Sequence, residues 1–216
     1  AVSLAHRGVL FLDEAPEFPP RVLDALRGPL ENGYVTICRS QAQTTYPARF
    51  QLVMALNPCP CGLADDPSGR CTCTPQQVRR YSGRLSGPIL DRVDVTVRMR
   101  PLTSAHLLDA SALPAGESSA VVHDRVVQAR ERAAARWQEA PWRCNAEVPG
   151  KVLRQMLPAN DATHIIEDAL MTGRLTARGV DKVLRIAWTV ADLEGKNEVD
   201  KACVAEAMGM RRGRLR

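Results

Sequence analysis

Two adjacent carboxylates, Asp13 and Glu14, end the apolar run Val9-Leu10-Phe11-Leu12 near the start of the sequence. Such a run is typical of a strand buried on both faces of a parallel sheet, and it places its last side chains at the carboxyl edge, where α/β proteins bind ligands. In nucleotide hydrolysis one carboxylate helps to hold Mg²⁺ and a second polarises the attacking water. The pair therefore predicts half of an ATP-hydrolysing site, with ATP and Mg²⁺ as cofactors.

The other half of such a site is a phosphate-binding loop with the pattern G-x-x-x-x-G-K-S/T. This pattern does not occur in the 216 residues. The sequence is therefore either a piece of a larger ATPase or a copy that has lost the chemistry. In both cases we expect this chain to be inactive in ATP hydrolysis on its own.

A second apolar run, residues 51–56, ends at Asn57-Pro58 and predicts another buried strand. If this strand is the neighbour of the first, Asn57 lies beside the two carboxylates. Between the strands we expect a helix over residues 21–30 and a hairpin over residues 34–50. The arms of the hairpin are predicted at 34–37 and 48–50, with 39–45 as the exposed tip, and a third strand is predicted at 93–99.

Residues 58–75 form a predicted loop that holds four of the seven cysteines, as Cys59-Pro60-Cys61 and Cys71-Thr72-Cys73. Two close pairs separated by a short loop suit a tetrahedral ion such as zinc, although C-x-C is tighter than the usual spacing of structural zinc sites. Two disulfides and four free thiols are the alternatives. Cys38, Cys144 and Cys203 are isolated and are interpreted as ordinary semi-buried residues.

The composition is that of an ordinary globular protein, with 45% hydrophobic and 25% charged residues. Aromatic residues make up only 4%, which argues against extended stacking on single-stranded nucleic acid. The net charge of +5 permits an anionic partner through charge alone. No stretch reaches the roughly 18 apolar residues of a membrane span, and no signal-peptide pattern begins the sequence, so we expect no membrane association and a cytoplasmic protein.

The character of the sequence changes after Pro101. We interpret residues 1–101 as an α/β domain, 102–119 as a linker and 120–216 as a separate all-helical domain, with helices predicted at 121–137, 162–171, 177–193 and 200–210. Several arginines lie on the first of these helices, among acidic residues. A solvated helix face is the favoured interpretation of these arginines, and a basic stripe that faces DNA is the alternative.

Five segments together resemble one known family: residues 8–14 (GVLFLDE), 27–39 (RGPLENGYVTICR), 46–62 (YPARFQLVMALNPCPCG), 84–94 (RLSGPILDRVD) and 175–195 (LTARGVDKVLRIAWTVADLEG). The chain is identified by these motifs as similar to the magnesium-chelatase-like AAA+ ATPases of the ComM/YifB type, in their C-terminal part. The resemblance implies a partial AAA+ P-loop ATPase core, with a hairpin insertion in its parallel sheet, followed by an all-helical lid like the C-terminal domain of magnesium chelatase.

The resemblance also implies roles for single residues. Asp13 would complete the Mg²⁺ shell, Glu14 would be the catalytic base, and Asn57 would be the polar sensor that orients water or the γ-phosphate. Arg92 resembles an arginine finger that serves the neighbouring subunit, with a salt bridge to a nearby aspartate as the alternative. Arg178 resembles the second sensor, which binds nucleotide from the lid, and Arg84 is a weaker candidate for the subunit boundary.

In this family the hairpin that precedes the sensor strand points into the pore of a hexameric ring, so Arg39 near its tip is a candidate for contact with DNA phosphates. A plain surface hairpin is the alternative. The resemblance implies a motor with helicase-like branch-migration activity on single-stranded or branched DNA, in recombination during natural transformation. It also implies self-association into a ring and a partner that supplies the missing N-terminal half of the ATPase.

Two other functions stay open. One is a non-catalytic, zinc-stabilised module that binds DNA or protein. The other is a motor for metal insertion, as in magnesium chelatase. A fragment, a split gene and a degenerate copy each account for the absent phosphate loop, and the presence of all five candidate ATPase residues favours the first two.

Overall fold

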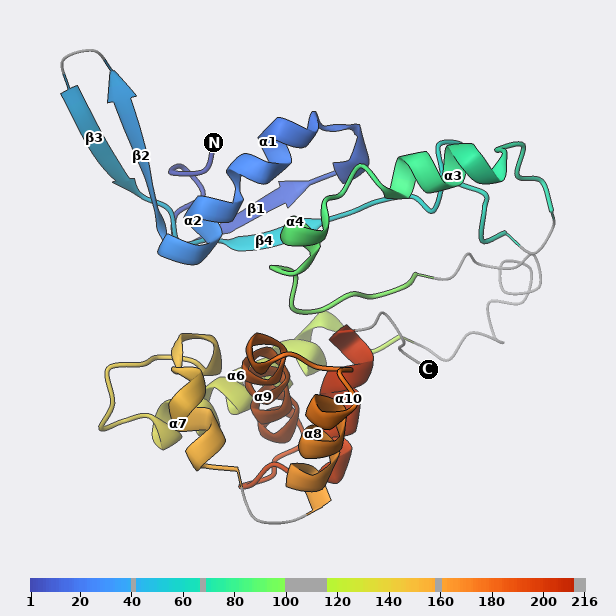
Figure 1. Cartoon of the computed structure of the whole chain (residues 1–216). Helices are drawn as coiled ribbons and strands as arrows, with labels where there is room; N and C mark the ends of the chain where they lie inside the picture. The colour runs from blue at the N-terminus through green and yellow to red at the C-terminus, as the bar shows by residue number, and fades with distance from the viewer. Residues whose placement is uncertain (40–41, 67–68, 100–115, 158–160, 212–216) are drawn as a thin grey trace. The chain divides into compact units, whose positions relative to one another are not determined.

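The computed structural model describes residues 1–39, 42–66, 69–99, 116–157 and 161–211 (Figure 1). The fold is mixed α/β, with a small parallel sheet and many helices. The chain divides into two compact units, Ala1–Val93 and Asp94–Arg216, and each is considered by itself. Most of the predicted linker at 102–119 lies outside the described residues, as does the end of the predicted first domain at Pro101.

The first unit is built around two parallel strands, β1 (Val9–Leu12) and β4 (Gln51–Met54), whose register pairs Leu12 with Met54. The predicted neighbouring strands are therefore confirmed. Their predicted burial on both faces is wrong. One face packs on a core that includes Leu23 and Ile89, while Phe11 on the other face is 56% exposed. The reason is that the described helices of this unit supply apolar side chains to one face only.

Short helices cover that face: η1 (Ala15–Glu17), α1 (Pro20–Ala25), α2 (Arg27–Asn32) and α4 (Gly87–Leu90), with α3 (Pro75–Ser82) following the cysteine-rich loop. The single helix predicted over residues 21–30 is thus two helices that meet at Leu26. Pro29 explains the break, because proline has no N–H to donate to the carbonyl four residues earlier.

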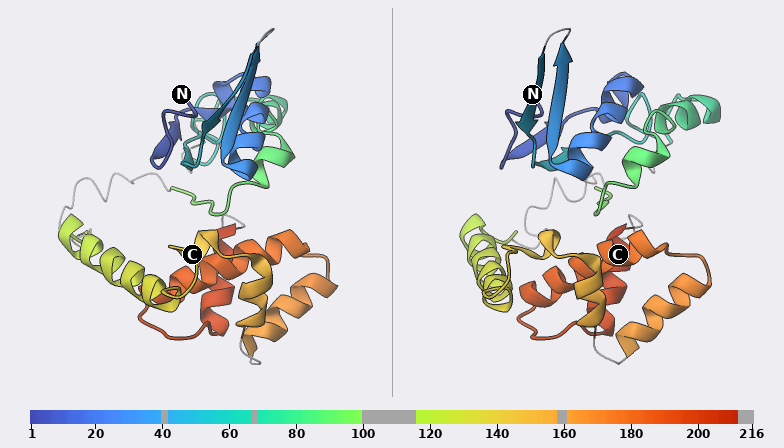
Figure 2. Two further views of the ribbon diagram at one scale, coloured as in Figure 1. Left: turned by 90° about the vertical axis from the view of Figure 1, so that its left-hand side faces the viewer. Right: turned by 60° about the vertical axis from the view of Figure 1, so that its left-hand side comes forward.

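The predicted hairpin is present, as strands β2 (Tyr34–Arg39) and β3 (Ala42–Pro47) in antiparallel pairing. It extends away from the parallel strands and from α1 and α2 (Figures 1 and 2). The return arm predicted at 48–50 is wrong, because it is β3 that pairs with β2. The hydroxyls of Thr36 and Thr45 lie 3.0 Å apart across the pair, and such β-branched cross-strand pairs stabilise a hairpin.

The strand predicted at 93–99 does not form. Val97 and Met99 are exposed, and the Thr96 N–H donates to the Met210 carbonyl at 2.9 Å. A strand needs a second extended backbone as its partner. Here the Thr96 N–H instead donates to a carbonyl near the end of a helix. Residues 93–99 therefore do not pair with another strand, although their apolar residues alternate as in a strand.

Every regular element described after residue 116 is helical. The helices are α6 (Ser119–Arg136), η2 (Asn145–Glu147), α7 (Gly150–Gln155), α8 (Asp161–Met171), α9 (Ala177–Leu193) and α10 (Lys201–Arg211). Helix α9 packs against α6, α7 and α10, and α10 packs against α8 (Figure 2). The buried positions of α9 repeat at helical spacing and include Val180, Val183, Leu184, Ala187, Trp188 and Ala191.

A polar cluster ties α6 to α9 inside this unit. The Asp192 carboxylate is 1% exposed, is ion-paired with Arg136 and accepts a 2.8 Å hydrogen bond from Asn145. The guanidinium of Arg136 also lies 4.1 Å from the ring centre of Trp188. Arg132 donates to the Asp192 carbonyl at 2.9 Å. The favoured interpretation of the α6 arginines as a solvated face is therefore wrong for these two, because α9 supplies buried acceptors.

Among the described residues, no helix combines the length and the apolar character that a membrane span requires.

Candidate functional site

Asp13, Glu14 and Asn57 lie at one edge of the parallel pair. The Ala55 N–H donates to the Leu12 carbonyl at 2.9 Å, and the Ala15 N–H donates to the Ala55 carbonyl at 2.9 Å. Backbone pairing thus continues past the ends of both strands and runs between the two carboxylates and the segment that leads to Asn57. All three side chains belong to exposed residues. Carboxylate and amide oxygens at the carboxyl end of parallel strands suit a hard cation and its anionic ligand.

The backbone at Glu14 is unusual. Its φ angle is 49° and its ψ angle 46°, the left-handed region that residues with a β-carbon seldom occupy. The Glu14 N–H donates to Asp13 Oδ1 at 3.0 Å, and the chain then turns directly into η1 with Pro16 in its first turn. The extended conformation of β1 therefore ends at Glu14, at the edge of the sheet where we expect the chemistry. Residues with strained backbone angles of this kind cluster at functional sites.

The strain predicts a stability difference between two variants. Glycine adopts positive φ angles without steric cost. We therefore expect the free energy of unfolding of the first unit to be about 1 kcal/mol higher in Glu14→Gly than in Glu14→Ala. Hydrogen exchange of the β1 and β4 amides measures this difference within the unit. Equal protection in the two variants would show that Glu14 is not held in the left-handed region.

Tyr81 belongs to the surroundings of this edge, although no sequence motif selects it. It lies on α3, is 5% exposed, and its phenol lies beside the backbone of Asn57. Burial raises the pKa of Tyr81, and the negative charges of Glu17 and Glu14 raise it further. Tyr81 thus packs against the segment that contains Asn57. The sequence separation of the two residues does not predict this contact, because the contact depends on the path of the intervening loop.

Two arginines of the segment 84–94 are held by acidic partners within the first unit. Arg92 is ion-paired with Glu31, donates to the Pro88 carbonyl at 2.8 Å, and has a side chain only 15% exposed. Arg84 pairs with Glu17 at 2.6 Å and donates to the Pro16 carbonyl at 3.1 Å, which places it beside η1. Arg92 is therefore paired with a glutamate on α2. The predicted alternative, a salt bridge with a nearby aspartate, named the wrong partner.

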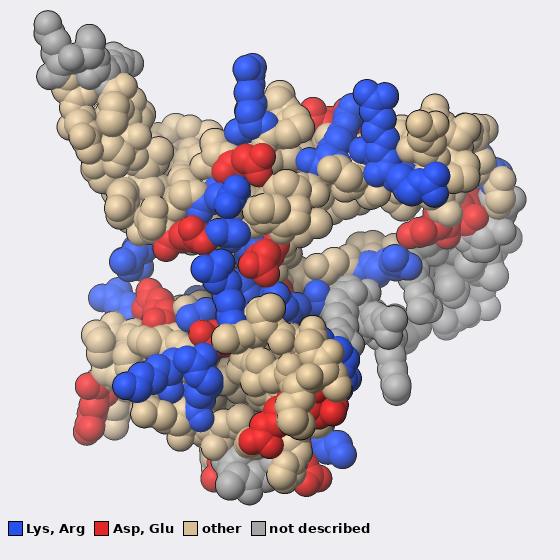
Figure 3. All heavy atoms as spheres, in the orientation of Figure 1, with Lys and Arg blue, Asp and Glu red and all other residues tan. Residues whose placement is uncertain are grey.

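The remaining two candidate arginines belong to other elements. Arg178 is an exposed residue in the first turn of α9, in the second unit, where the Thr176 hydroxyl caps the helix by accepting from the Gly179 N–H at 3.1 Å. Arg39 is the last residue of β2, and its side chain lies outside the described part of the chain. The described side chains of the hairpin carry no charge (Figure 3).

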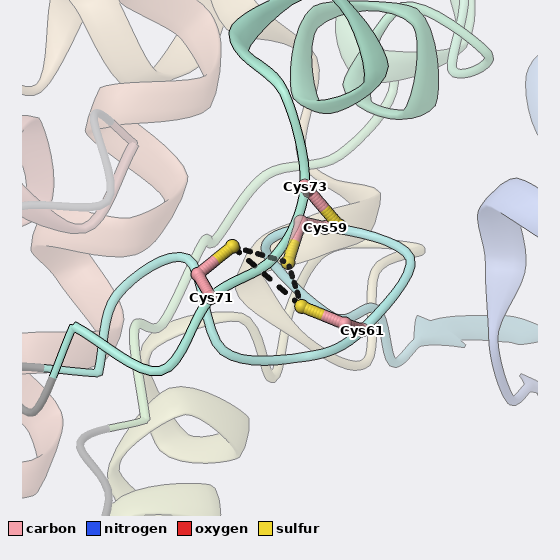
Figure 4. Close-up of side chains that lie close together, drawn as sticks. All are labelled: Cys59, Cys61, Cys71 and Cys73. Carbon is pink, nitrogen blue, oxygen red and sulfur yellow. Dashed lines mark hydrogen bonds between the residues drawn. The ribbon is translucent and has the colours of Figure 1, made fainter.

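The four cysteines of the loop converge, as Figure 4 shows. Their sulfur atoms all lie within 4.8 Å of one another, and the cysteines are not joined in disulfides. Cys59 is fully buried, whereas Cys61 is exposed. The backbone N–H of Leu63 donates to the Cys61 thiol and, with the Cys59 thiol, lowers the pKa of Cys61 to about 6. The predicted ligand set is therefore brought together in space.

Two family comparisons cover nearly all of the chain. The family described as magnesium chelatase, subunit ChlI, matches residues 1–107, and the family of the ChlI C-terminal region matches residues 116–211. The chain belongs to the magnesium-chelatase-like family. This confirms the resemblance identified from the five sequence segments.

The relatives include proteins of the ComM/YifB type. Protein Rv2897c of Mycobacterium tuberculosis is 49% identical over 98% of this chain and 41% of its own length. YifB of Escherichia coli is 43% identical over 97% of this chain and 40% of its own length. Competence protein ComM of Haemophilus influenzae is 40% identical over the same shares, 97% and 40%. This magnesium-chelatase-like chain thus spans about two fifths of the length of these relatives.

Proposed function

We propose that this chain is the C-terminal segment of an AAA+ ATPase that acts in the cytoplasm as a hexameric, ATP-driven DNA motor of the branch-migration type. The observation that carries the proposal is the placement of Asp13, Glu14 and Asn57 after two paired parallel strands. Membership of the magnesium-chelatase-like family supports an AAA+-type ATPase. The name of its relative, competence protein ComM, supports a role in competence.

The residues at the edge fit the proposed chemistry. Mg²⁺ prefers oxygen ligands, usually one or two carboxylates with water and phosphate oxygens, and Asp13 offers an exposed carboxylate of this kind. When bound, Mg²⁺·ATP supplies the electrophilic γ-phosphate. Glu14 would accept the proton of the attacking water, and the Asn57 amide would orient that water or the phosphate.

The arginines would act from subunit boundaries. Arg92 is neutralised by Glu31 within its own unit. Its proposed role as a finger toward a neighbouring nucleotide therefore requires it to exchange the glutamate for a phosphate. Such an arginine contributes about 10³-fold or more to the rate of phosphoryl transfer. Arg178, at the start of α9, would bind the nucleotide from the helical unit.

One face of the parallel sheet is exposed to solvent, which supports the proposal that a further segment packs there. Val9 is 61%, Phe11 56% and Val53 41% exposed on that face. Apolar residues of a parallel sheet are normally covered on both sides. We propose that the segment with the phosphate-binding loop covers this face and completes the nucleotide site.

Nucleotide binding tests the proposal. A fluorescent ATP analogue is titrated into the chain alone, the phosphate-loop segment alone and their mixture, each with Mg²⁺. We expect saturable binding in the mixture and a ring-sized species by analytical ultracentrifugation. A mixture that forms but binds no nucleotide would contradict the proposal.

The proposed DNA contact gives a separate prediction. Arg39→Ala in the assembled ring is expected to weaken binding of branched DNA. The association constant should also depend less steeply on salt, with the magnitude of the slope of its logarithm against log[salt] reduced by about one for each phosphate that the arginine neutralises. Arg21→Ala, an exposed arginine on α1, is the matched control and is expected to leave the slope unchanged. Equal slopes for Arg39→Ala and the unsubstituted ring would remove Arg39 from the DNA interface.

Two alternatives make different demands. A non-catalytic binding module would bind DNA or protein unchanged after Glu14→Gln. A metal-insertion motor, which the name of the matched family favours, would have its ATP turnover raised by a metal-free chelating ligand and not by branched DNA.

A further inference from the structure

We propose that Cys59, Cys61, Cys71 and Cys73 bind one Zn²⁺ as a closed tetrathiolate site, and that this site clamps the segment after β4 to the start of α3. The four residues come from the two ends of one loop, and their sulfur atoms share one small volume (Figure 4). The proposal concerns the fold of the first unit and does not depend on ATP binding.

The distances match a tetrahedral zinc ion. With Zn–S bonds of about 2.3 Å, the edges of an ideal ZnS₄ tetrahedron are about 3.8 Å. The sulfur of Cys59 lies 3.3 Å from that of Cys61 and 3.8 Å from that of Cys71, and the Cys61 and Cys71 sulfurs are 3.6 Å apart. All six separations stay within 4.8 Å. Disulfide sulfurs are instead about 2.05 Å apart.

The backbone around the cluster also suits a thiolate site. The Gly62 N–H donates to the Cys59 carbonyl at 2.9 Å, and Gly62 has a φ angle of 78°, which glycine adopts without steric cost. This tight turn accompanies the close approach of the Cys59 and Cys61 sulfurs, which lie 3.3 Å apart. Cys59 is buried, whereas Cys71 and Cys73 are partly exposed, so an ion can reach the cluster from solvent.

The position of the cluster in the chain defines its structural role. Cys59 lies close after Asn57, with only a proline between them, and Cys73 directly precedes Thr74, whose capping box begins α3. The phenol of Tyr81 on the same helix lies beside the backbone of Asn57. A metal that joins both ends of the loop would therefore close a ring from the end of β4 through α3 and back to Asn57.

Metal analysis of the purified chain is the first test. We expect one zinc per chain in the unsubstituted protein and in Cys144→Ser, an exposed cysteine outside the cluster. Cys59→Ser and Cys71→Ser are expected to lose at least nine tenths of this zinc, because removal of even an outer-shell partner of a ligand weakens metal binding about 10- to 100-fold. Three results would each overturn the proposal. The first is less than one tenth of a zinc ion per chain in protein prepared with zinc, and the second is bound iron with visible absorption. The third is a molecular mass lowered by the four hydrogens that are lost when two disulfides form.

Two further measurements use the unsubstituted protein and so do not depend on variants that fold poorly. Replacement of zinc by Co²⁺ is expected to give the intense visible bands of a tetrahedral tetrathiolate, and an octahedral spectrum would contradict the site. Removal of the metal by a chelator is expected to increase amide exchange in residues 55–66 and in α3 by about tenfold or more, with α8 to α10 unchanged. Unchanged exchange in a protein that has lost its metal would overturn the clamp.

Discussion

Glu14→Gln in the assembled ATPase is expected to lower ATP turnover by about 10² to 10⁴-fold, the usual contribution of a general base, with nearly unchanged nucleotide binding. Glutamine preserves the size of the side chain and its hydrogen-bonding reach, but its amide does not accept a proton from water. Steady-state turnover and equilibrium nucleotide binding of the mixture of this chain and the phosphate-loop segment separate the two effects.

Glu17→Gln is the matched control. It removes the same charge from the next turn of the chain, where Glu17 is half-exposed and paired with Arg84. Exposed ion pairs contribute little to stability, so we expect this variant to keep turnover within a few-fold of the unsubstituted mixture, about the effect of up to 1 kcal/mol. Equal decreases in the two variants would assign the effect to general charge at the edge and would remove Glu14 from the role of base.

Asp192→Ala is expected to lower the free energy of unfolding of the helical unit by about 3 to 5 kcal/mol. The substitution leaves Arg136, whose side chain is 13% exposed, as a buried charge without its carboxylate. It also removes an acceptor of the Asn145 amide. All three tryptophans, at positions 137, 142 and 188, belong to this unit. Urea unfolding followed by tryptophan fluorescence therefore reports the helical unit separately from the first unit.

Asp168→Ala is the control for this prediction. Asp168 is also ion-paired with an arginine, Arg174, but its side chain is 57% exposed. Solvent screens such a pair, so a decrease below about 1 kcal/mol is expected. If Asp192→Ala costs no more than Asp168→Ala, the cluster between α6 and α9 does not stabilise the unit in the way its burial implies.

The sequence was sufficient to predict features that depend on local pattern. Two apolar runs that end in polar residues predicted the parallel strands of the first unit and the common edge of Asp13 and Asn57. The helix predicted at 177–193 coincides with α9, because apolar positions recur at helical spacing from the Thr176 cap to Ala191. Paired C-x-C motifs predicted that four sulfurs converge.

Contacts between distant residues could not be predicted in this way. The pairing of Arg92 with Glu31 joins residues 61 positions apart, and Arg136 reaches Asp192 over 56 positions. Each depends on the packing of helices and not on spacing. The segment 93–99 shows the converse case. Its apolar alternation is typical of a strand, but pairing with a second extended backbone decides whether a strand forms.

Steady-state ATP hydrolysis by this chain, by the phosphate-loop segment and by their mixture, with and without branched DNA, tests the central claim most directly. The claim is that the edge with Asp13, Glu14 and Asn57 is one half of a nucleotide-hydrolysing site. We expect turnover in the mixture alone, increased by branched DNA and abolished in Glu14→Gln. A mixture that assembles and binds ATP but hydrolyses none, or that hydrolyses it equally well with Glu14→Gln, would contradict the claim.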